Sequence, residues 1–126
     1  LRRLILYILR TMILLAVLNI ARDSMATTGF SPATRVFEAA GAGACLITDA
    51  WVGLELFLKA DKEVLVARDG KDVAEHVASL TAERAKAIGH VARERILREH
   101  TYARRGAQLD AILKQAAAQK LERSVA

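Results

Sequence analysis

Apolar positions along this chain follow two different patterns. Mostly apolar runs predict buried strands over 14–20, 44–48 and 63–67, because strands that are covered on both faces lack a polar side. The segments between and after these runs carry apolar residues at helical spacing, which predicts amphipathic helices. Strands that alternate with helices are typical of an α/β fold with right-handed crossovers. The pattern therefore predicts a parallel sheet flanked by helices.

The first well-marked helix is predicted over 31–40. Pro32 suits the first helical turn, where its missing N–H costs nothing, and Ser31 before it is a natural N-cap. Gly41 and Gly43 end the helix and permit a tight turn into the next strand. The residues expected to face inward are Val36, Phe37 and Ala40.

Three more helices are predicted after the last strand. Asp69 or Asp72 caps the first of them, and Thr81 caps the second. A break near 100–101 leads into the last helix, whose tail is expected to fray from Gln115. The predicted inward residues are Val73, Val77 and Leu80 in the first, Ala85, Ile88, Ala92 and Ile96 in the second, and Tyr102, Leu109, Ile112 and Ala116 in the last.

The segment 29–38 carries groups that suit a phosphorylated ligand. Ser31 and Thr34 offer hydroxyl and backbone N–H groups at the start of a helix, where the dipole and the unpaired donors favour an anion. Glu38, within two turns of that end, is placed to accept hydrogen bonds from ribose hydroxyls. Ser31 also works as an N-cap without a ligand, and Arg35 either neutralises phosphate or points into solvent. Together these groups favour a nucleotide diphosphate over a bare anion.

Residues at the ends of the predicted strands are further candidates for the binding site. Arg22 follows the first strand, where a cation would stabilise a leaving diphosphate. Asp49 and Trp51 follow the second strand, and ligands of open parallel sheets bind outside that edge. Trp51 either stacks on a base or sugar or packs under the loop. Asp49 either lines the site or caps the short helix expected after it.

Length and composition narrow the class of protein. A chain of 126 residues suits one domain, and its net charge of +5 is spread among mixed charges, so no nucleic-acid partner is expected. Cys45 is the single cysteine, which predicts a buried thiol in a reducing compartment and hence a cytoplasmic protein. Motifs for zinc binding, nucleotide hydrolysis and acyl transfer are missing from the sequence, so neither a metal nor a cofactor is expected.

The amino-terminal segment 4–20 is strongly apolar and leaves two interpretations open. In one, a short amphipathic helix precedes the first buried strand. In the other, the segment inserts into a membrane, although its length is at the short limit for spanning a bilayer and Arg10 lies near its centre. That alternative describes a non-enzymatic, membrane-associated protein anchored by residues 4–20. We treat residues 1–17 as an apolar leader and 18–126 as the folded domain.

Four motifs in order carry a resemblance to a known family. They are Gly29–Asp49, Trp51–Phe57, Glu63–Arg68, and Arg93–Tyr102 with Arg105. Over about 18–113 the chain resembles the donor-binding half of the CgeB-like (spore-protein) glycosyltransferases. The resemblance implies a Rossmann-like domain with a helical carboxyl-terminal tail, the carboxyl-terminal half of a GT-B fold, which binds a nucleotide-diphosphate sugar without a metal. It also implies a missing amino-terminal acceptor domain, so the isolated chain is expected to bind nucleotide weakly and to catalyse no transfer.

The resemblance also gives individual residues a role. Glu38 corresponds to the second acid of a Glu-x7-Glu pattern, the one expected to hold the nucleotide ribose. The first acid would fall at Phe30, so this chain lacks a carboxylate there for direct contact with the sugar. His100 and Thr101 resemble a family signature near the carboxyl end, where we expect a structural helix junction. A receiver-like signalling domain is disfavoured, because the paired acids expected at the end of its first strand are missing.

Overall fold

The computed structural model describes residues 15–125. At its centre is a sheet of three parallel strands in the order β1-β2-β3, with Leu18 paired to Ile47 and Thr48 paired to Val66. The strands are β1 (Val17–Asn19), β2 (Leu46–Asp49) and β3 (Leu65–Ala67). All three predicted strands and their parallel arrangement are therefore confirmed, although each strand is shorter than the apolar run that predicted it.

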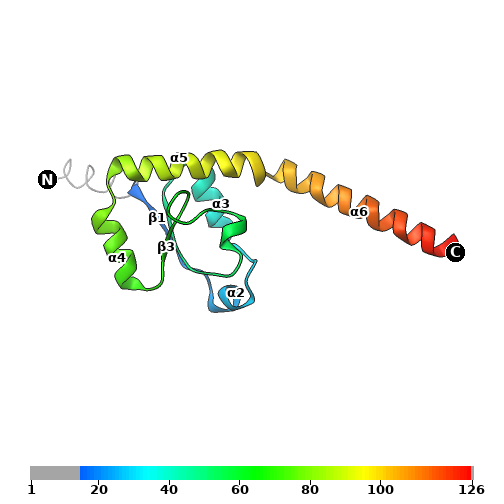
Figure 1. Cartoon of the computed structure of the whole chain (residues 1–126), viewed down its shortest axis with the longest axis horizontal. Coiled ribbons are helices and arrows are strands. Elements are labelled where there is room, and N and C mark those ends of the chain that lie inside the picture. The colour runs from blue at the N-terminus through cyan, green and yellow to red at the C-terminus, as the bar shows by residue number, and fades with distance from the viewer. Residues whose placement is uncertain (1–14, 126) are drawn as a thin grey trace, which may run out of the picture.

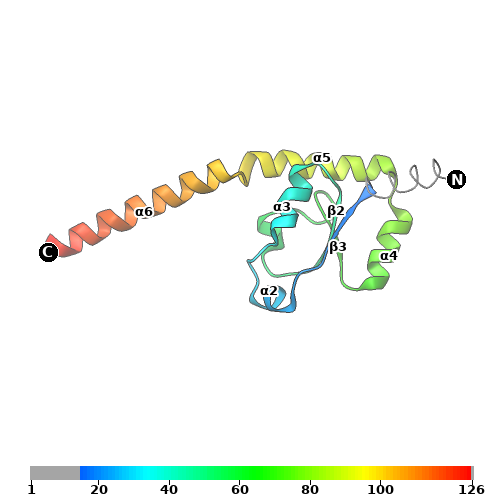
Figure 2. The same ribbon diagram turned by 180° about the vertical axis from the view of Figure 1, so that it is seen from behind.

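Helices surround this sheet and continue beyond it. They are α2 (Asp23–Thr28), α3 (Thr34–Gly41), the 3-10 turn η1 (Leu54–Leu56), α4 (Gly70–Ser79), α5 (Ala82–Glu99) and α6 (Tyr102–Val125). Helix α5 runs along one side of the domain, from the end of α4 past α3, and α6 projects away from the domain (Figure 1). The view from behind also shows α6 extending away from the domain (Figure 2).

Successive residues of the strands pack into two separate cores, one on each face of the sheet. Cys45 and Ile47 face one core, whereas Leu46 between them faces the other. The first core also contains Leu65, Ala67, Ala85 and Ile88, and the second also contains Val36, Ala40, Leu58, Val64, Ala92 and Ile96. Helix α5 contributes to both cores, so it holds α3 and α4 against the same sheet. Its predicted inward stripe is confirmed.

A close backbone approach fixes where α5 crosses the turn between α3 and β2. A Cβ atom added at Gly89 would collide with the carbonyl oxygen of Gly43. Because the obstacle is backbone, it cannot move aside as a flexible side chain would. The lack of a side chain at Gly89 therefore permits the contact that aligns α5 with α3.

The helix caps confirm two predictions and correct a third. The Asp69 side chain accepts hydrogen bonds at the start of α4, and Thr81 does so at the start of α5. The prediction that Ser31 is an N-cap is wrong, because α3 begins at Thr34 after Ala33, which is still extended (φ −64°, ψ 144°). Upstream, the Phe30 N–H bonds to the Val52 carbonyl at 2.7 Å and ties the chain to the loop after β2. The helix therefore starts later than the position of Pro32 suggests.

The predicted inward face of the last helix is wrong. Tyr102, Leu109 and Ile112 are 90%, 57% and 62% exposed, and Ala116 is exposed as well. Along 15–125, no other element covers this stripe. The helix also continues past Gln115 to Val125, where fraying was expected. In α4, Val77 is likewise 49% exposed although the spacing placed it inward.

Most of the apolar leader lies outside the described residues. The interpretations of residues 1–14 therefore stay predictions, whereas residues 17–19 form β1 of the sheet, as the strand interpretation of the segment 4–20 predicted. Within residues 15–125, none of the helices combines the length and the apolar character that crossing a bilayer demands.

Candidate functional site

A cavity of about 510 Å³ lies between the first two turns of α3 and the junction of α5 with α6. Its volume is within the range usual for small-molecule sites. One wall is formed by Pro32, Thr34, Phe37 and Glu38, and the other by Ile96, His100, Thr101, Tyr102 and Arg105. The cavity thus lies beside the segment that the sequence marked as a phosphate and ribose site.

The α3 wall presents both a carboxylate and free backbone donors. Thr34 and Glu38 are four residues apart, so their side chains share one face of the helix. The Val36 N–H bonds to the Ala33 carbonyl at 3.0 Å, but none of residues 15–125 accepts a hydrogen bond from the amides of Thr34 or Arg35. Such unpaired amides at a helix start attract an anion. The wall can therefore bind hydroxyls through Glu38 and an anion through the helix start.

The opposite wall carries an imidazole hydrogen-bonded to a guanidinium. His100 Nδ1 lies 2.6 Å from Arg105 Nη2, and Arg105 Nη1 donates to Gln108 Oε1 at 2.9 Å. The His100 side chain is only 6% exposed, and its ring centroid lies 5.9 Å from that of Phe37 and 5.5 Å from that of Phe57. Burial and the nearby Arg105 charge both lower the pKa of His100. A neutral ring can accept a hydrogen bond at Nδ1, so this pairing is consistent with the lowered pKa.

Charges of opposite sign face the cavity without pairing with each other. Glu38 lines one wall and Arg105 the other, and in the described part of the chain neither takes part in an ion pair. A carboxylate accepts hydrogen bonds from hydroxyls, whereas a guanidinium donates to phosphate oxygens. The cavity therefore offers complementary partners for a ligand that has both a sugar and an anionic group.

Three of the other predicted site residues are at the surface. Ser31 is exposed immediately before Pro32 of the cavity wall, and Arg35 is exposed on α3. Arg22 is exposed at the start of α2, where its carbonyl accepts hydrogen bonds from Met25 and Ala26. The structure thus brings Thr34 and Glu38 together at the cavity but does not bring Arg22 there.

Asp49 and Trp51 lie on the loop after β2 and do not line this cavity. Asp49 Oδ1 accepts hydrogen bonds from the Ala21 N–H at 2.9 Å and from Thr48 Oγ1 at 3.2 Å, which ties the end of β1 to β2. Asp49 does not cap η1, because Gly53 occupies the cap position. Trp51 is 8% exposed and lies in the core, with its ring centroid 5.9 Å from that of Phe57.

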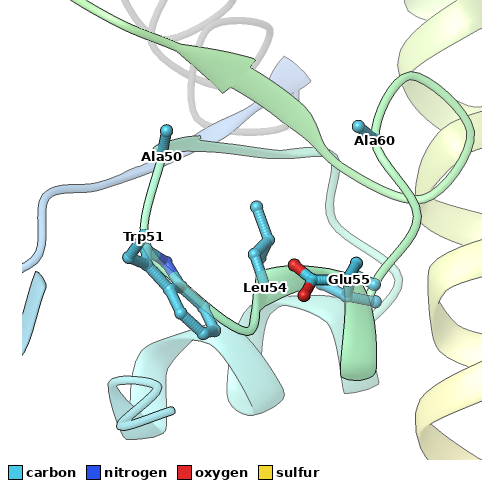
Figure 3. Close-up of a pocket in the computed structure, with 6 residues that line it drawn as sticks. Ala50, Trp51, Leu54, Glu55 and Ala60 are labelled. Atoms are coloured by element: carbon cyan, nitrogen blue, oxygen red, sulfur yellow. The ribbon is translucent and has the colours of Figure 1, made fainter. Parts of the chain in front are cut away.

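A smaller cavity of about 220 Å³ lies beside Trp51. Figure 3 shows Trp51 and Leu54 on its wall, with Ala50 and Ala60 at opposite ends. Glu55 is the charged residue among those that line it. Its small volume and apolar walls suit a nucleotide diphosphate less well than the cavity beside α3.

A third hollow, of about 630 Å³, lies where α5 crosses the turn before β2 and includes Gly43, Lys86, His90 and Arg93. Gly43 precedes β2, so this hollow is at the amino-terminal edge of the sheet. Ligands of open parallel sheets bind at the opposite edge. The cavity beside α3 therefore remains the best candidate site.

Sequence reasoning assigned a structural junction to His100 and an inward packing position to Tyr102, and it gave neither these residues nor Arg105 a role in binding. All three belong to the fourth motif, so the motif was the signal in the sequence that could have marked them as site residues. The motif does not show which other element these residues lie against. Across the described range, no group of three or more His, Cys, Asp and Glu side chains is arranged to hold a metal ion.

Residues 8–111 match a protein family described as glycosyl transferase-like. The chain belongs to this family. The match covers most of the chain, including α3, both walls of the cavity and the first turns of α6. No curated protein is significantly similar to this glycosyl transferase-like chain in sequence.

The fold is similar to that of a solved structure, sucrose-phosphate synthase from Thermosynechococcus elongatus. The TM-score is 0.60 at 19% sequence identity, and the match covers 71% of this chain and 23% of the synthase. At this identity the likeness concerns the fold alone. With the three parallel strands and flanking helices, it confirms the predicted Rossmann-like half of a GT-B fold.

Proposed function

We propose that this glycosyl transferase-like domain binds a nucleotide-diphosphate sugar in the cavity beside α3. The observation that carries the proposal is the position of Thr34, Glu38 and the free amides of the α3 start on one wall of a cavity of about 510 Å³. Membership of the glycosyl transferase-like family supports a transferase. The order of the four sequence motifs is the support for the carboxyl-terminal half of a CgeB-like enzyme.

In the proposed complex, the ligand lies along the first two turns of α3. The Glu38 carboxylate accepts hydrogen bonds from the ribose hydroxyls. The amides of Thr34 and Arg35 and the Thr34 hydroxyl bind the diphosphate, helped by the positive end of the helix dipole. Ser31, exposed just ahead of the helix, supplies a second hydroxyl to the diphosphate in this proposed complex. The ribose and the diphosphate thus bind one helical turn apart.

The proposed reaction is transfer of a hexosyl group to an acceptor. The bond between the sugar and the diphosphate breaks as the acceptor bonds to the sugar, and negative charge develops on the leaving diphosphate. Donors fixed at the helix start stabilise that charge. In the proposed reaction a second domain presents the acceptor, and this domain binds the donor without transferring the sugar by itself. The alternative, membrane attachment through residues 4–20, stays a prediction.

Calorimetric titration with UDP, GDP, ADP and TDP tests the proposal. At least one of these diphosphates should bind more tightly than the corresponding nucleoside, because the nucleoside lacks the anion. Glu38→Ala should weaken that binding at least several-fold, since it removes the hydrogen bonds from the ribose to a charged carboxylate, each worth about 1.5–3 kcal/mol.

Glu75→Ala is the matched control, because Glu75 is exposed on α4, away from the cavity, and carries the same charge. It should bind like the unchanged chain. Equal affinity of Glu38→Ala and the unchanged chain would remove Glu38 from the site. If no nucleoside diphosphate binds the unchanged chain, the proposal fails as a whole.

A further inference from the structure

Arg105 is a positively charged residue on the cavity wall. Neither the family motif nor the proposed function assigns it a role. We propose that Arg105 contacts the diphosphate of the bound donor, and that His100 is a positioning residue that holds its guanidinium at the cavity. This inference rests on the proposed function and adds to it a positively charged side chain that recognises the anion.

The charge of Arg105 is available to a ligand. Its bonds to His100 and Gln108 are made to uncharged groups and leave further N–H donors free. In the described structure, no carboxylate lies within ion-pair distance of it. The start of α3, on the facing wall, has free backbone N–H groups, which also attract negative charge. An anion in this cavity would therefore meet donors from both sides.

His100 is placed to fix the position of Arg105. Its ring is held between Phe37 of α3 and Phe57 of the loop after η1, and its side chain is 94% buried, so it cannot turn freely. The 2.6 Å contact at Nδ1 then sets where the Arg105 Nη2 atom lies. Because Arg105 is otherwise an exposed side chain on a projecting helix, this bond reduces the rotamer entropy that ligand binding would cost.

The environment of His100 favours the neutral form of the ring, which can accept this hydrogen bond. Arg105 from α6, Arg95 and Glu99 from α5, and Glu63 from the segment before β3 all act on it. Burial and the Arg105 charge outweigh the two carboxylates and lower the pKa of His100, which favours the neutral ring at neutral pH, and a neutral ring can accept at Nδ1. Nε2 then carries the proton, and it is buried without a hydrogen-bond partner.

The first test compares Arg105→Gln with Arg104→Gln. The two variants lose the same charge at neighbouring positions of α6, but the Arg104 side chain is exposed and does not line the cavity. Affinity for inorganic pyrophosphate, and for the nucleoside diphosphate that the chain binds, is measured by calorimetry. Arg105→Gln should weaken both about tenfold, as expected for a hydrogen bond to a charged group, whereas Arg104→Gln should change neither.

The second test separates positioning from structural support. His100→Asn keeps an acceptor near the Nδ1 position and should bind pyrophosphate almost as the unchanged chain does, whereas His100→Leu should weaken binding several-fold. The double variant His100→Leu/Arg105→Gln should be no weaker than Arg105→Gln alone, because His100 acts through Arg105. Additive losses in the double variant would contradict the positioning role. Circular dichroism checks that each variant is folded, and the Arg105 variants test the anion contact independently of this buried position.

The outcomes distinguish this inference from the proposed function. If Glu38→Ala weakens nucleotide binding and Arg105→Gln does not, the inference is overturned and the proposed function stands. If Arg105→Gln abolishes pyrophosphate binding but no nucleoside diphosphate binds more tightly than pyrophosphate, Arg105 is an anion contact and the nucleotide-sugar assignment fails. Absence of binding of pyrophosphate and of every nucleoside diphosphate to the unchanged chain would overturn both.

Discussion

His100 lies between a charged cluster and the cavity. Its Nδ1 atom is bonded to Arg105, and its Nε2 atom lies 3.9 Å from Glu99 Oε2, which is too far for a hydrogen bond. Behind it, Arg95 lies 3.6 Å from Glu63 and 3.6 Å from Glu99. Burial, together with the charges of Arg105 and Arg95, lowers the pKa of His100 and so favours its neutral form.

The lowered pKa of His100 predicts a pH dependence of stability. The unfolded chain takes up the proton near the ordinary value of 6.5, whereas the folded chain resists it. The free energy of unfolding should therefore fall as the pH drops below 6.5 and through the folded-state pKa of His100. Urea unfolding at intervals between about pH 5 and pH 7.5 measures this effect. In the folded chain, the carboxyl groups of Asp72, with a pKa of about 2, and Glu99, whose pKa is also lowered, titrate below this pH range.

The control for this prediction is His90→Gln, because His90 is exposed on α5. That variant should keep the pH dependence, and His100→Asn should lose most of it. An unchanged dependence in His100→Asn would show that another group is responsible.

Helix α5 connects all the parts of the domain. Its amino-terminal half packs against the core of Cys45 and Ile47, and its carboxyl-terminal half packs against α3. The sequence predicted its inward stripe because Ala85, Ile88, Ala92 and Ile96 define one continuous face. The same reasoning gave a wrong inward face for α6, because spacing shows that a helix has an apolar side but not that another element covers it.

Gly89→Ala should destabilise the domain by about 1–3 kcal/mol, because its methyl group would collide with the Gly43 carbonyl. This effect should exceed the gain of about 1 kcal/mol that alanine gives in a helix interior. Gly106→Ala in α6 is the control, since nothing lies within 4 Å of a Cβ there, and it should leave stability unchanged or slightly higher. Chemical unfolding followed by tryptophan fluorescence measures both. Equal stability of the two variants would mean that α5 can shift without loss.

The whole molecule consists of a packed α/β domain and a projecting helix. The domain comprises β1 to α5, and from Tyr102 to Lys120 every residue of α6 is exposed (Figure 1). Burial of apolar surface is the main source of folding stability, and these residues of α6 bury little. Only the first turns of α6 contribute to the cavity, through Tyr102 and Arg105.

Removal of the residues after Gln108 should therefore leave the domain folded. The melting temperature should change by no more than about 2 °C, because about 4–8 °C corresponds to 1 kcal/mol in a domain of this size. The truncated chain keeps the Arg105–Gln108 bond, so its affinity for a nucleoside diphosphate should also be unchanged. Differential scanning calorimetry and titration measure the two quantities. A large fall in melting temperature would show that α6 packs against the domain in solution.

The sequence by itself determined the elements of the fold and one wall of the candidate site. Strands and helices followed from short-range patterns, and Thr34 and Glu38 share a helix face because they are four residues apart. These features depend on residues close together in the chain. The start of α3 was misplaced because its position depends on the bond between Phe30 and Val52, which are distant in sequence.

Only the tertiary structure decided what faces Glu38. His100 and Arg105 are more than sixty positions away along the chain, and they reach the cavity because α5 packs along α3, with Gly89 allowing the close approach near Gly43. Contact between residues so far apart in the sequence depends on how whole helices and strands pack. The periodicity within one element does not specify which other element it packs against. For the same reason the sequence could not show that the apolar stripe of α6 is left uncovered in this domain.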